Sequence, residues 1–312
     1  MSFIKAQRIV DPVLTSIARG YTNAEFIAEK LFPVVKVKKE SAKIPTFGKE
    51  AFRSYKSERA IAAQSNKIRE FAMDTVTYET KEHDLEYHLD YRVIKESDLD
   101  QKKYATNLVV DGLKLNHEIA VAKLVQNAAT FDSANKEVLT DNYLDDPETD
   151  VVAYIDEKKE ALRAIIGKEP NVMVMGPKVL KALKQHPKNI ERIKYSQKGI
   201  LTLDLLKELF DMKNIFVGKG LYTEDDAAFK DIWGENIILA YLANPTGLAS
   251  TYYEPCFGYT LRVEGNPFVD RYQTHGGKVE IVRATDNYDI KLVGKESAFL
   301  IGDVLGYEPS EE

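Results

Sequence analysis

The chain has 312 residues, of which 44% are apolar and 29% charged, and its formal net charge is −6. This composition predicts a globular protein with one large core or two, and it excludes an intrinsically disordered chain. No run of about 18 apolar residues occurs, which excludes a membrane-spanning helix, and the first residues lack the apolar stretch of a secretory signal. The single cysteine, Cys256, excludes an internal disulfide and a thiolate-rich zinc site. We therefore expect a chain that folds in the cytoplasm.

Charge is distributed unevenly along the sequence. Residues 33–72 carry ten Lys and Arg against four Asp and Glu, so the first 72 residues carry +7 and the remaining 240 carry −13. A basic segment on an acidic body could bind nucleic acid, with a steep salt dependence, or it could contact the acidic body of the next copy of the chain. Glutamates interrupt the basic residues and no stacking series of aromatic residues accompanies them, which favours contact between copies.

The first 32 residues are predicted to form an extended arm with two short helical pieces. The second piece ends before Pro33 and has one apolar face, formed by Ala24, Ile27, Ala28 and Leu31. Two or three helical turns are not stable alone, so we expect this face to pack on another surface.

A strand and then a long loop follow the arm. Residues 34–47 alternate between apolar and lysine side chains, with Val35 and Val37 on one face, which predicts a strand. From about residue 49 to residue 70 no hydrophobic periodicity remains, and the residues are mostly small, polar or basic. A loop of this length in a compact domain usually has a function, the alternative being a disordered surface excursion.

A long strand and a long helix are predicted next. Alternation from residue 75 to residue 93 places Leu85, Tyr87, Leu89, Tyr91 and Val93 on one face, with a bulge or bend between Thr80 and Asp84. The helix is predicted over residues 98–130, where apolar residues recur at steps of three and four. About 30 helical residues would span about 45 Å, which is typical of a spine along a flat subunit. The residues of the predicted stripe are Tyr104, Leu108, Leu115, Ile119 and Ala122.

After the acidic segment 141–150 the pattern becomes α/β. Helices are predicted over 150–166, 177–184 and 203–210, and strands over 172–175, 215–217 and 237–242. The last segment, 278–301, is predicted as two strands joined by a turn at Asp286-Asn287. The predicted fold class is therefore α+β.

The sequence contains no recognisable catalytic, cofactor or metal motif. His83 and His88 are five residues apart in a predicted strand, so they point to opposite faces and cannot share one ion. Gly294-Lys295 lacks the first glycine of a phosphate-binding loop, because position 289 is Asp. The segment VMVMGPK (172–178) fits an anion site at a helix start, but Pro177 removes one amide and an ordinary helix start fits better. We predict no enzyme activity, no cofactor and no metal.

Three stretches resemble the major capsid proteins of tailed phages, which share the fold named for phage Hong Kong ninety-seven. They are ARGYTNAEFIAEKLFPVVKVKKESAKIPTFGKEAFR (18–53), SERAIAAQSNKIREF (57–71) and DNYDIKLVGKESAFLI (286–301). The resemblance extends over nearly the whole chain through the order of elements. It implies a fold with an N-terminal arm, an extended loop, a peripheral domain with a spine helix, and an α/β axial domain.

The resemblance implies a division of the chain into five parts. They are an N-terminal arm with the first strand (1–47), an extended loop (48–74), a peripheral domain with the spine helix 98–130 (75–150), an axial domain (151–257) and a C-terminal β segment returning to both domains (258–312). In this family the arm lies across a neighbouring subunit and the extended loop reaches over the peripheral domain of the adjacent subunit.

The implied function is a shell subunit that self-assembles as hexamers and pentamers into an icosahedral phage head around double-stranded DNA. Candidate contacts of the extended loop with a neighbour are Arg53, Lys56, Arg59, Lys67 and Arg69, and those of the arm are Ile27, Ala28 and Leu31. The alternative for the arm residues is packing on their own subunit. Expected partners are a separate scaffolding protein, a portal and decoration proteins, with no membrane. The expected location is the virion, after assembly in the host cytoplasm.

Two alternative functions follow from the same observations. An encapsulin-like nanocompartment shell shares the fold and encloses cargo protein instead of DNA. A soluble α/β enzyme with a site assembled from scattered residues would need a concave pocket with converging polar groups.

Overall fold

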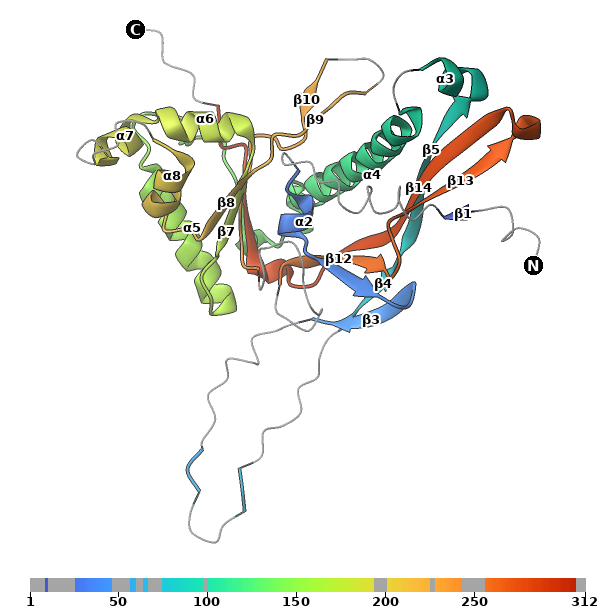
Figure 1. Cartoon of the computed structure of the whole chain (residues 1–312). Coiled ribbons are helices and arrows are strands. Elements are labelled where there is room, and N and C mark those ends of the chain that lie inside the picture. Colours follow the sequence, from blue (N-terminus) through green and yellow to red (C-terminus); the bar gives the residue numbers. More distant parts are fainter. Residues whose placement is uncertain are drawn as a thin grey trace.

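The structure is a computed structural model, and it describes residues 9–10, 26–46, 57–59, 64–66, 75–97, 100–193, 201–224, 228–242 and 256–306. Two lobes lie side by side, each built on its own sheet (Figure 1). The lobe that contains most of the segment predicted as the peripheral domain is called the peripheral lobe below, and the lobe that contains residues 151–242 is called the axial lobe. The peripheral lobe has a six-stranded sheet with the long helix α4 along one face. The axial lobe has a five-stranded sheet whose far face is covered by short helices. The fold class is α+β, as the sequence predicts.

Strand β14 (Val279–Leu292) is the centre of the peripheral sheet. One of its edges pairs with β5 (Lys81–Asp90), and the other pairs in succession with β13 (Phe268–Thr274) and β12 (Gly258–Val263), all antiparallel. Helix α4 (Gln101–Val125) packs on the face of β5 and β14. Its apolar residues toward the sheet form a small core with the strands: Leu89, Ala105, Val109, Val110, Leu113, Val269, Val282 and Ala284.

The N-terminal segment is fixed to this sheet at several places. Strand β1 (Ile9–Val10) pairs with β13, and β2 (Val34–Val37) runs parallel to β12. The one-turn helix α2 (Ala28–Leu31) lies between β2 and α4. Strands β3 (Ser41–Pro45) and β4 (Thr75–Glu79) form a separate antiparallel ribbon. Strands β1, β2 and β5 from the first half of the chain therefore pair with strands from its last quarter.

The axial sheet has the order β6-β15-β11-β7-β8. Helices α5 to α8 cover the face that points away from the peripheral lobe (Figure 1). A short hairpin, β9 with β10, stands apart from the sheet. The bounds of these elements are β6 Lys136–Val138, α5 Val151–Ile166, β7 Val172–Met175, α6 Pro177–Gln185, α7 Pro187–Ile193, α8 Leu203–Leu209, β8 Asn214–Val217, β9 Leu221–Tyr222, β10 Lys230–Asp231, β11 Ile237–Ala240 and β15 Ala298–Gly302.

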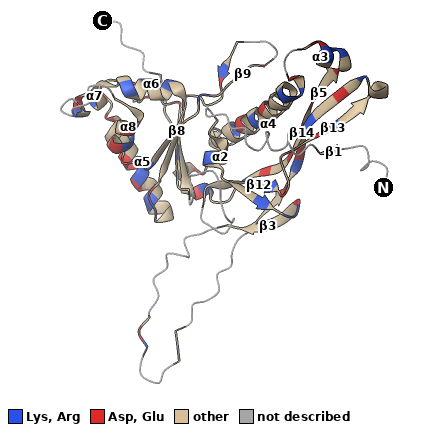
Figure 2. Ribbon diagram, viewed as in Figure 1, with Lys and Arg blue, Asp and Glu red and all other residues tan. Residues whose placement is uncertain are grey.

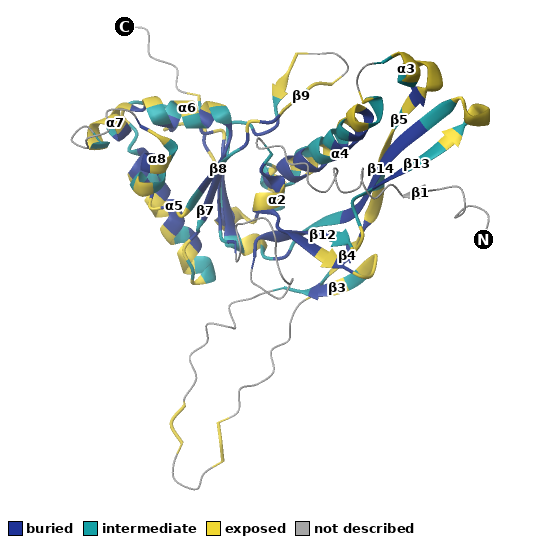
Figure 3. Ribbon diagram, viewed as in Figure 1, coloured by how far each residue is buried: buried dark blue, intermediate teal, exposed yellow. Residues whose placement is uncertain are grey.

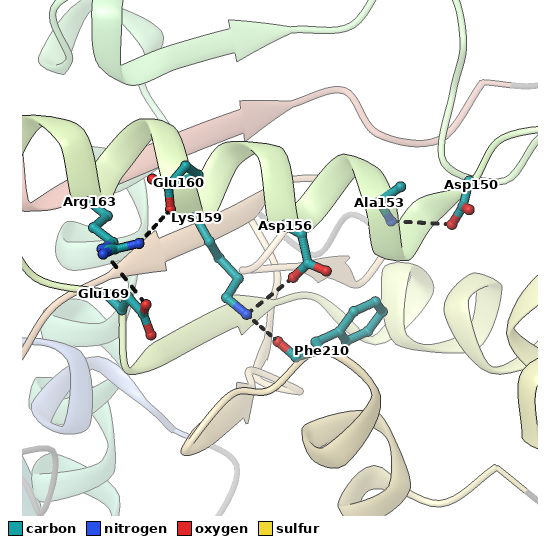
Figure 4. A network of polar contacts seen from close by, with 8 residues as sticks. All are labelled: Asp150, Ala153, Asp156, Lys159, Glu160, Arg163, Glu169 and Phe210. Carbon is teal, nitrogen blue, oxygen red and sulfur yellow. Dashed lines mark hydrogen bonds and ion pairs between the residues drawn. The ribbon is translucent and has the colours of Figure 1, made fainter.

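Helix α5 is tied to its surroundings by a chain of polar contacts (Figure 4). The carboxylate of Asp150 accepts a hydrogen bond from the Ala153 amide at 3.2 Å and caps the helix. Lys159 donates to the backbone oxygen of Phe210 at 2.8 Å, which holds α5 against the end of α8. An Arg163–Glu160 pair at 3.0 Å lies on the exposed side, where such pairs add little stability.

The axial sheet is shared between two hydrophobic cores, because alternate residues of a strand point to opposite faces. Met173, Ile237 and Phe299 face α5 to α8, whereas Val174, Ile238 and Leu300 face α4, α2 and β12. All six side chains are buried, and Figure 3 shows the sheet as the most continuously buried part of the chain. The axial sheet therefore contributes side chains to the hydrophobic cores on both of its faces and joins the two lobes.

Most of the elements predicted in the axial part are confirmed within one to two residues. The predicted break in the strand after residue 75 is also confirmed, because β4 ends at Glu79 and β5 begins at Lys81 with a different partner strand. The predicted helix start at Gly176-Pro177 is confirmed, with Pro177 as the first residue of α6.

The predicted spine helix is correct in kind and wrong in its bounds and in half of its stripe. Helix α4 begins at Gln101, with the Asp100 carboxylate accepting from the Lys103 amide, and ends at Val125. Tyr104 and Leu108 are 56% and 44% exposed. The first half of α4 has apolar residues on two sides, and the small or branched ones fit against the sheet. The second half of the predicted stripe does face the core.

Two further predictions are wrong. Residues 91–93 do not continue the strand: α3 (Tyr91–Glu96) begins there, capped by the Asp90 carboxylate accepting from the Arg92 amide at 2.9 Å. Asp286-Asn287 is not a turn, because β14 runs through it. Both residues pair with β5 along one edge of β14. The Asp286 carboxylate also forms an ion pair with Arg262 at 3.1 Å, which stabilises its charge inside the strand.

Two glycines provide a test of packing, Gly218 at the junction of the lobes and Gly112 between α4 and β5. A Cβ at Gly218 would lie 2.0 Å from Cδ1 of the buried Trp233, whereas a Cβ at Gly112 would lie 2.6 Å from Cδ1 of the half-exposed Leu85. We expect Gly218→Ala to lower the free energy of unfolding by about 1–3 kcal/mol, because Trp233 has no room to move. Gly112→Ala should be neutral or add up to about 1 kcal/mol, because Leu85 can turn aside and a helical glycine is removed. Urea unfolding of the unassembled chain measures both, and equal effects would contradict the packing argument.

Candidate intersubunit surfaces and the junction that positions them

The extended loop leaves the body from a rigid base. Ile44 of β3 and Tyr78 of β4 are buried, and the Tyr78 hydroxyl donates to the backbone oxygen of Lys39 at 3.1 Å. The Glu79 amide donates to the Asp289 carboxylate of β14 at 2.9 Å. Both ends of the loop are therefore held by core packing and by the peripheral sheet.

The far part of the loop is described at residues 57–59 and 64–66, and all six residues are exposed. The Asn66 side-chain amide donates to the backbone oxygen of Glu58 at 2.9 Å, so the two pieces approach each other. Figure 1 shows them well away from both lobes. Of the predicted loop contacts, Arg59 is exposed here, and Arg53, Lys56, Lys67 and Arg69 lie outside the described residues.

The predicted arm contacts with a neighbour are replaced by contacts within the chain. Ile27, Ala28 and Leu31 are 2%, 1% and 0% exposed, and they pack in the core with Val121, Val125 and residues of β7, β11 and β12. The apolar face of the arm therefore packs on its own subunit, which is the alternative that the sequence left open. The spacing identified the face correctly but could not identify the surface that covers it.

Glu118 of α4 connects three distant segments at the junction. Its carboxylate accepts hydrogen bonds from the amides of Ile27, at 2.9 and 3.1 Å, and Ala28, at 2.7 Å. It also accepts from Nε1 of Trp233 at 2.7 Å. Burial raises the pKa of Glu118, against the opposing effect of these donors. One carboxylate thus holds the arm, the spine helix and the axial lobe together. The spacing of residues in the sequence does not predict these contacts, and the only hint is that the chain has a single tryptophan.

A second group of polar side chains, of which Asp286 is buried and Glu29 is about half exposed, fixes the arm to the peripheral sheet. Arg262 of β12 contacts Glu29 of α2 at 3.1 Å and Asp286 of β14 at 3.1 Å. Burial acts to raise the pKa of Glu29, but the charge and hydrogen bond of Arg262, together with the nearby His117 and Lys114, outweigh it and the pKa is lowered. Burial raises the pKa of Asp286 in spite of Arg262.

His117 lies beside this group on α4 and is 4% exposed. Its Nε2 lies 3.1 Å from the Thr260 hydroxyl, and its ring meets the Tyr288 ring edge-on. Burial, assisted by the charge of Arg262, lowers the pKa of His117 to about 3. The histidine is therefore a neutral core residue at physiological pH.

His83 and His88 lie on opposite faces of β5, as their spacing predicts. His83 stacks on Tyr288 on the α4 side of β5, and His88 contacts Glu86, whose carboxylate accepts from Tyr272 on the opposite face. Within the ranges that the structure describes, no three His, Cys, Asp or Glu side chains gather as metal ligands. No helix among these residues is long and apolar enough to cross a membrane.

The two-lobed architecture, with a spine helix and an excursion that projects from a ribbon, is that of a shell-forming capsid subunit. Residues 122–279 match the family model described as phage major capsid protein E. The chain is 46% identical to the major capsid protein of Burkholderia phage BcepMu over 309 residues, which are 98% of this chain and 100% of the relative. A phage-related protein from Bordetella bronchiseptica RB50 has a similar solved structure, with a TM-score of 0.80, 33% identity, and 95% and 98% of the two chains covered. The chain belongs to the phage major capsid protein family.

More distant structures share the fold alone. The capsid of cyanophage P-SCSP1u has a TM-score of 0.57 at 12% identity, covering 91% of this chain and 89% of its own. The encapsulin of Synechococcus elongatus PCC 7942 has a TM-score of 0.53 at 10% identity, covering 97% and 100%. Fold similarity thus does not separate phage shells from encapsulin shells, whereas the 46% identity to a phage capsid protein does.

The role of Glu118 can be tested by Glu118→Gln, which keeps the shape of the side chain. The amide NH2 of Gln would face the N–H donors of the arm and of Trp233, and it cannot accept their hydrogen bonds. We expect the free energy of unfolding to fall by about 2–3 kcal/mol, because hydrogen bonds to a charged acceptor are lost. Glu160→Gln is the control, since Glu160 lies on the exposed side of α5 with 68% of its side chain accessible. Urea unfolding of the unassembled chain gives both values, and a variant at position 118 as stable as the control would contradict the role.

His117 makes stability depend on pH in a predictable direction. His117 is protonated below about pH 6.5 in the unfolded chain, but only below about pH 3 in the folded chain. Stability should therefore fall as pH decreases through this window, at a slope approaching about 1.4 kcal/mol per pH unit. His117→Gln lacks this proton, so the difference in unfolding free energy between the two chains should change by about 1.4 kcal/mol between roughly pH 5.5 and 4.5. Parallel pH profiles of the two chains would show that His117 does not titrate as inferred.

Proposed function

We propose that this major capsid protein self-assembles as hexamers and pentamers into an icosahedral phage head that encloses double-stranded DNA. The observation that supports this most directly is the excursion of residues 47–74, whose described far end is exposed and remote from both lobes, while its base is held by buried residues. An excursion of this kind acquires a partner surface when another copy of the chain lies beside it.

The role is structural, without catalysis, and the binding energy comes from many modest contacts per subunit. The basic loop of one copy meets the acidic body of the next, as the +7 and −13 charges of the two parts favour. Scaffolding comes from a separate protein, and a portal and decoration proteins complete the head. Assembly takes place in the host cytoplasm, and DNA is enclosed without sequence preference.

Negative-stain electron microscopy and light scattering of the purified chain test this function. Closed shells, or rings of five and six copies, are the expected result, with scaffold candidates and crowding agents added where the chain alone stays dispersed. A chain that remains a monomer of about 35 kDa under all of these conditions would contradict self-assembly.

Neutralising the loop charges should weaken assembly and leave the monomer fold intact. The variant replaces Arg53, Lys56, Arg59, Lys67 and Arg69 by Gln, and we expect roughly a tenfold lower yield of closed shells, because the charge attraction between copies is lost. The control replaces five exposed lysines elsewhere by Gln, namely Lys95, Lys103, Lys123, Lys181 and Lys213. Yield is measured by sedimentation and electron microscopy, and circular dichroism checks the fold. Normal heads from the loop variant would refute the contact.

A further inference from the structure

Strand β5 is a long edge strand of the peripheral sheet. Among the described residues it pairs only with β14, so about half of the backbone N–H and C=O groups of its ten residues point away from the sheet. Most of its side chains are exposed, as Figure 3 shows along the strand. A long unpaired edge is a template for another extended segment, and natural proteins usually shorten or cover such edges.

A row of residues on α4 lies beside this edge. Tyr104, Leu108 and Gly112 are four residues apart and therefore share one side of the helix. The Tyr104 ring meets the Tyr87 ring of β5 edge-on, with centroids 6.3 Å apart, and a Cβ at Gly112 would lie 2.6 Å from Leu85 of β5. Tyr104, Leu108 and Leu85 are 56%, 44% and 37% exposed. A strand added to β5 would place every second side chain against this row, where burial of apolar surface stabilises it.

The face of β5 away from α4 is acidic. Glu82 and Asp84 alternate with the residues that contact α4, so they point to the opposite face. Residues 82–90 contain no Lys or Arg (Figure 2). Arg283 of β14 lies 4.0 Å from Asp84, but it is paired more closely with Asp270, at 2.6 Å. A strand added at this edge would therefore pair best with basic side chains on this face.

Segments of a second copy of the chain fit this edge poorly. A second β5 would bring its own acids to the same face, and like charges opposite each other destabilise a strand pair. Residues 35–38 alternate valine and lysine, but they lie in or directly after β2, which already pairs with β12. Residues 49–70 are basic but have no hydrophobic periodicity, so they do not supply alternate apolar side chains. The edge therefore fits a segment of a different protein better.

We propose that the free edge of β5 binds an extended segment of a separate protein, in which apolar and basic side chains alternate. The segment continues the peripheral sheet through backbone hydrogen bonds to β5. Its apolar side chains cover Leu85, Tyr104 and Leu108, and its basic side chains pair with Glu82 and Asp84. The site belongs to the folded subunit and does not require assembly, so its failure would leave the proposed function standing.

Fluorescence anisotropy of labelled peptides with the unassembled full chain tests the site. The probe peptide alternates lysine and valine, and the control peptide has the same residues in two blocks, which keeps the charge and removes the alternation. We expect the alternating peptide to bind roughly tenfold more tightly, because only this peptide can place valines on α4 and lysines on the acidic face at the same time. Equal affinities would indicate charge attraction alone and would overturn the inference, as would an alternating peptide that does not bind.

Matched variants of the chain locate the bound peptide. Leu108→Ala and Asp84→Lys should each weaken binding of the alternating peptide roughly five- to tenfold, through lost apolar contact and reversed charge. The controls are Ile190→Ala, which truncates a side chain that is 46% exposed on α7, and Glu160→Lys, which reverses an exposed acid that also has an arginine beside it. Circular dichroism should show unchanged folds, because all four side chains are exposed. Variants that bind the peptide as well as their controls do would overturn the inference.

Hydrogen–deuterium exchange and competition identify the edge and the source of the segment. Binding of the alternating peptide should slow exchange of the backbone amides of residues 81–90, and exchange that slows only elsewhere would contradict the proposed site. A peptide with the sequence of residues 49–70 serves as an unlabelled competitor. We expect it to displace the probe no better than the block peptide does. Displacement as effective as that by unlabelled alternating peptide would assign the edge to a second copy and overturn the separate partner.

Discussion

The geometry of the subunit depends on one buried carboxylate. Glu118 accepts hydrogen bonds from two amides at the start of α2 and from the indole of Trp233, so that it fixes the arm and the axial lobe against the same turn of α4. A buried carboxylate is costly unless donors surround it, and here three groups from two distant segments do so. Because its donors come from residues 27, 28 and 233, this arrangement forms only when the whole junction is assembled. The carboxylate therefore fixes the positions of the arm, the spine helix and the axial lobe relative to one another at the same time.

The elements that project from the body are fixed to it in different ways. The extended loop is rooted on the β3–β4 ribbon and the peripheral sheet, through Tyr78 and Asp289. The β9–β10 hairpin is rooted through the hydrogen bond from the Ile232 amide to the Gly220 oxygen, on the side of the body opposite the described loop pieces (Figure 1). Rigid roots with exposed tips suit a subunit that must bind neighbours at fixed angles, since the angle is set by the body and the affinity by the tips. In the proposed assembly, the positive charge of the first 72 residues of one copy attracts the negative charge of the remainder of the next copy.

Sequence reasoning predicted the fold where local pattern and burial agree. The strands predicted over 172–175 and 237–242 match β7 and β11, which are buried on both faces, and the helix predicted over 150–166 matches α5. It failed where tertiary contacts overrule the pattern. Tyr104 and Leu108 have helical spacing but lie on the exposed side of α4, and Asp286-Asn287 has turn chemistry but is held within β14 by β5 and Arg262. Spacing also identified the apolar face of α2 without its covering surface, and it gave no indication of the contact between Glu118 and Trp233. Contacts across about 90 to 115 positions are not visible in local patterns.

The order of strands has a consequence for synthesis on the ribosome. β14 is the central strand of the peripheral sheet, and β15 lies between β6 and β11 in the axial sheet, yet both come from residues 279–302. Neither sheet can close until the last tenth of the chain has been made, because among the described strands β5 pairs only with β14 and β6 pairs only with β15. A polypeptide broken off before residue 279 lacks the strand that joins β5 to β12 and β13, as well as the one that joins β6 to β11. Prematurely terminated chains therefore lack a strand in both sheets and cannot present a finished subunit surface.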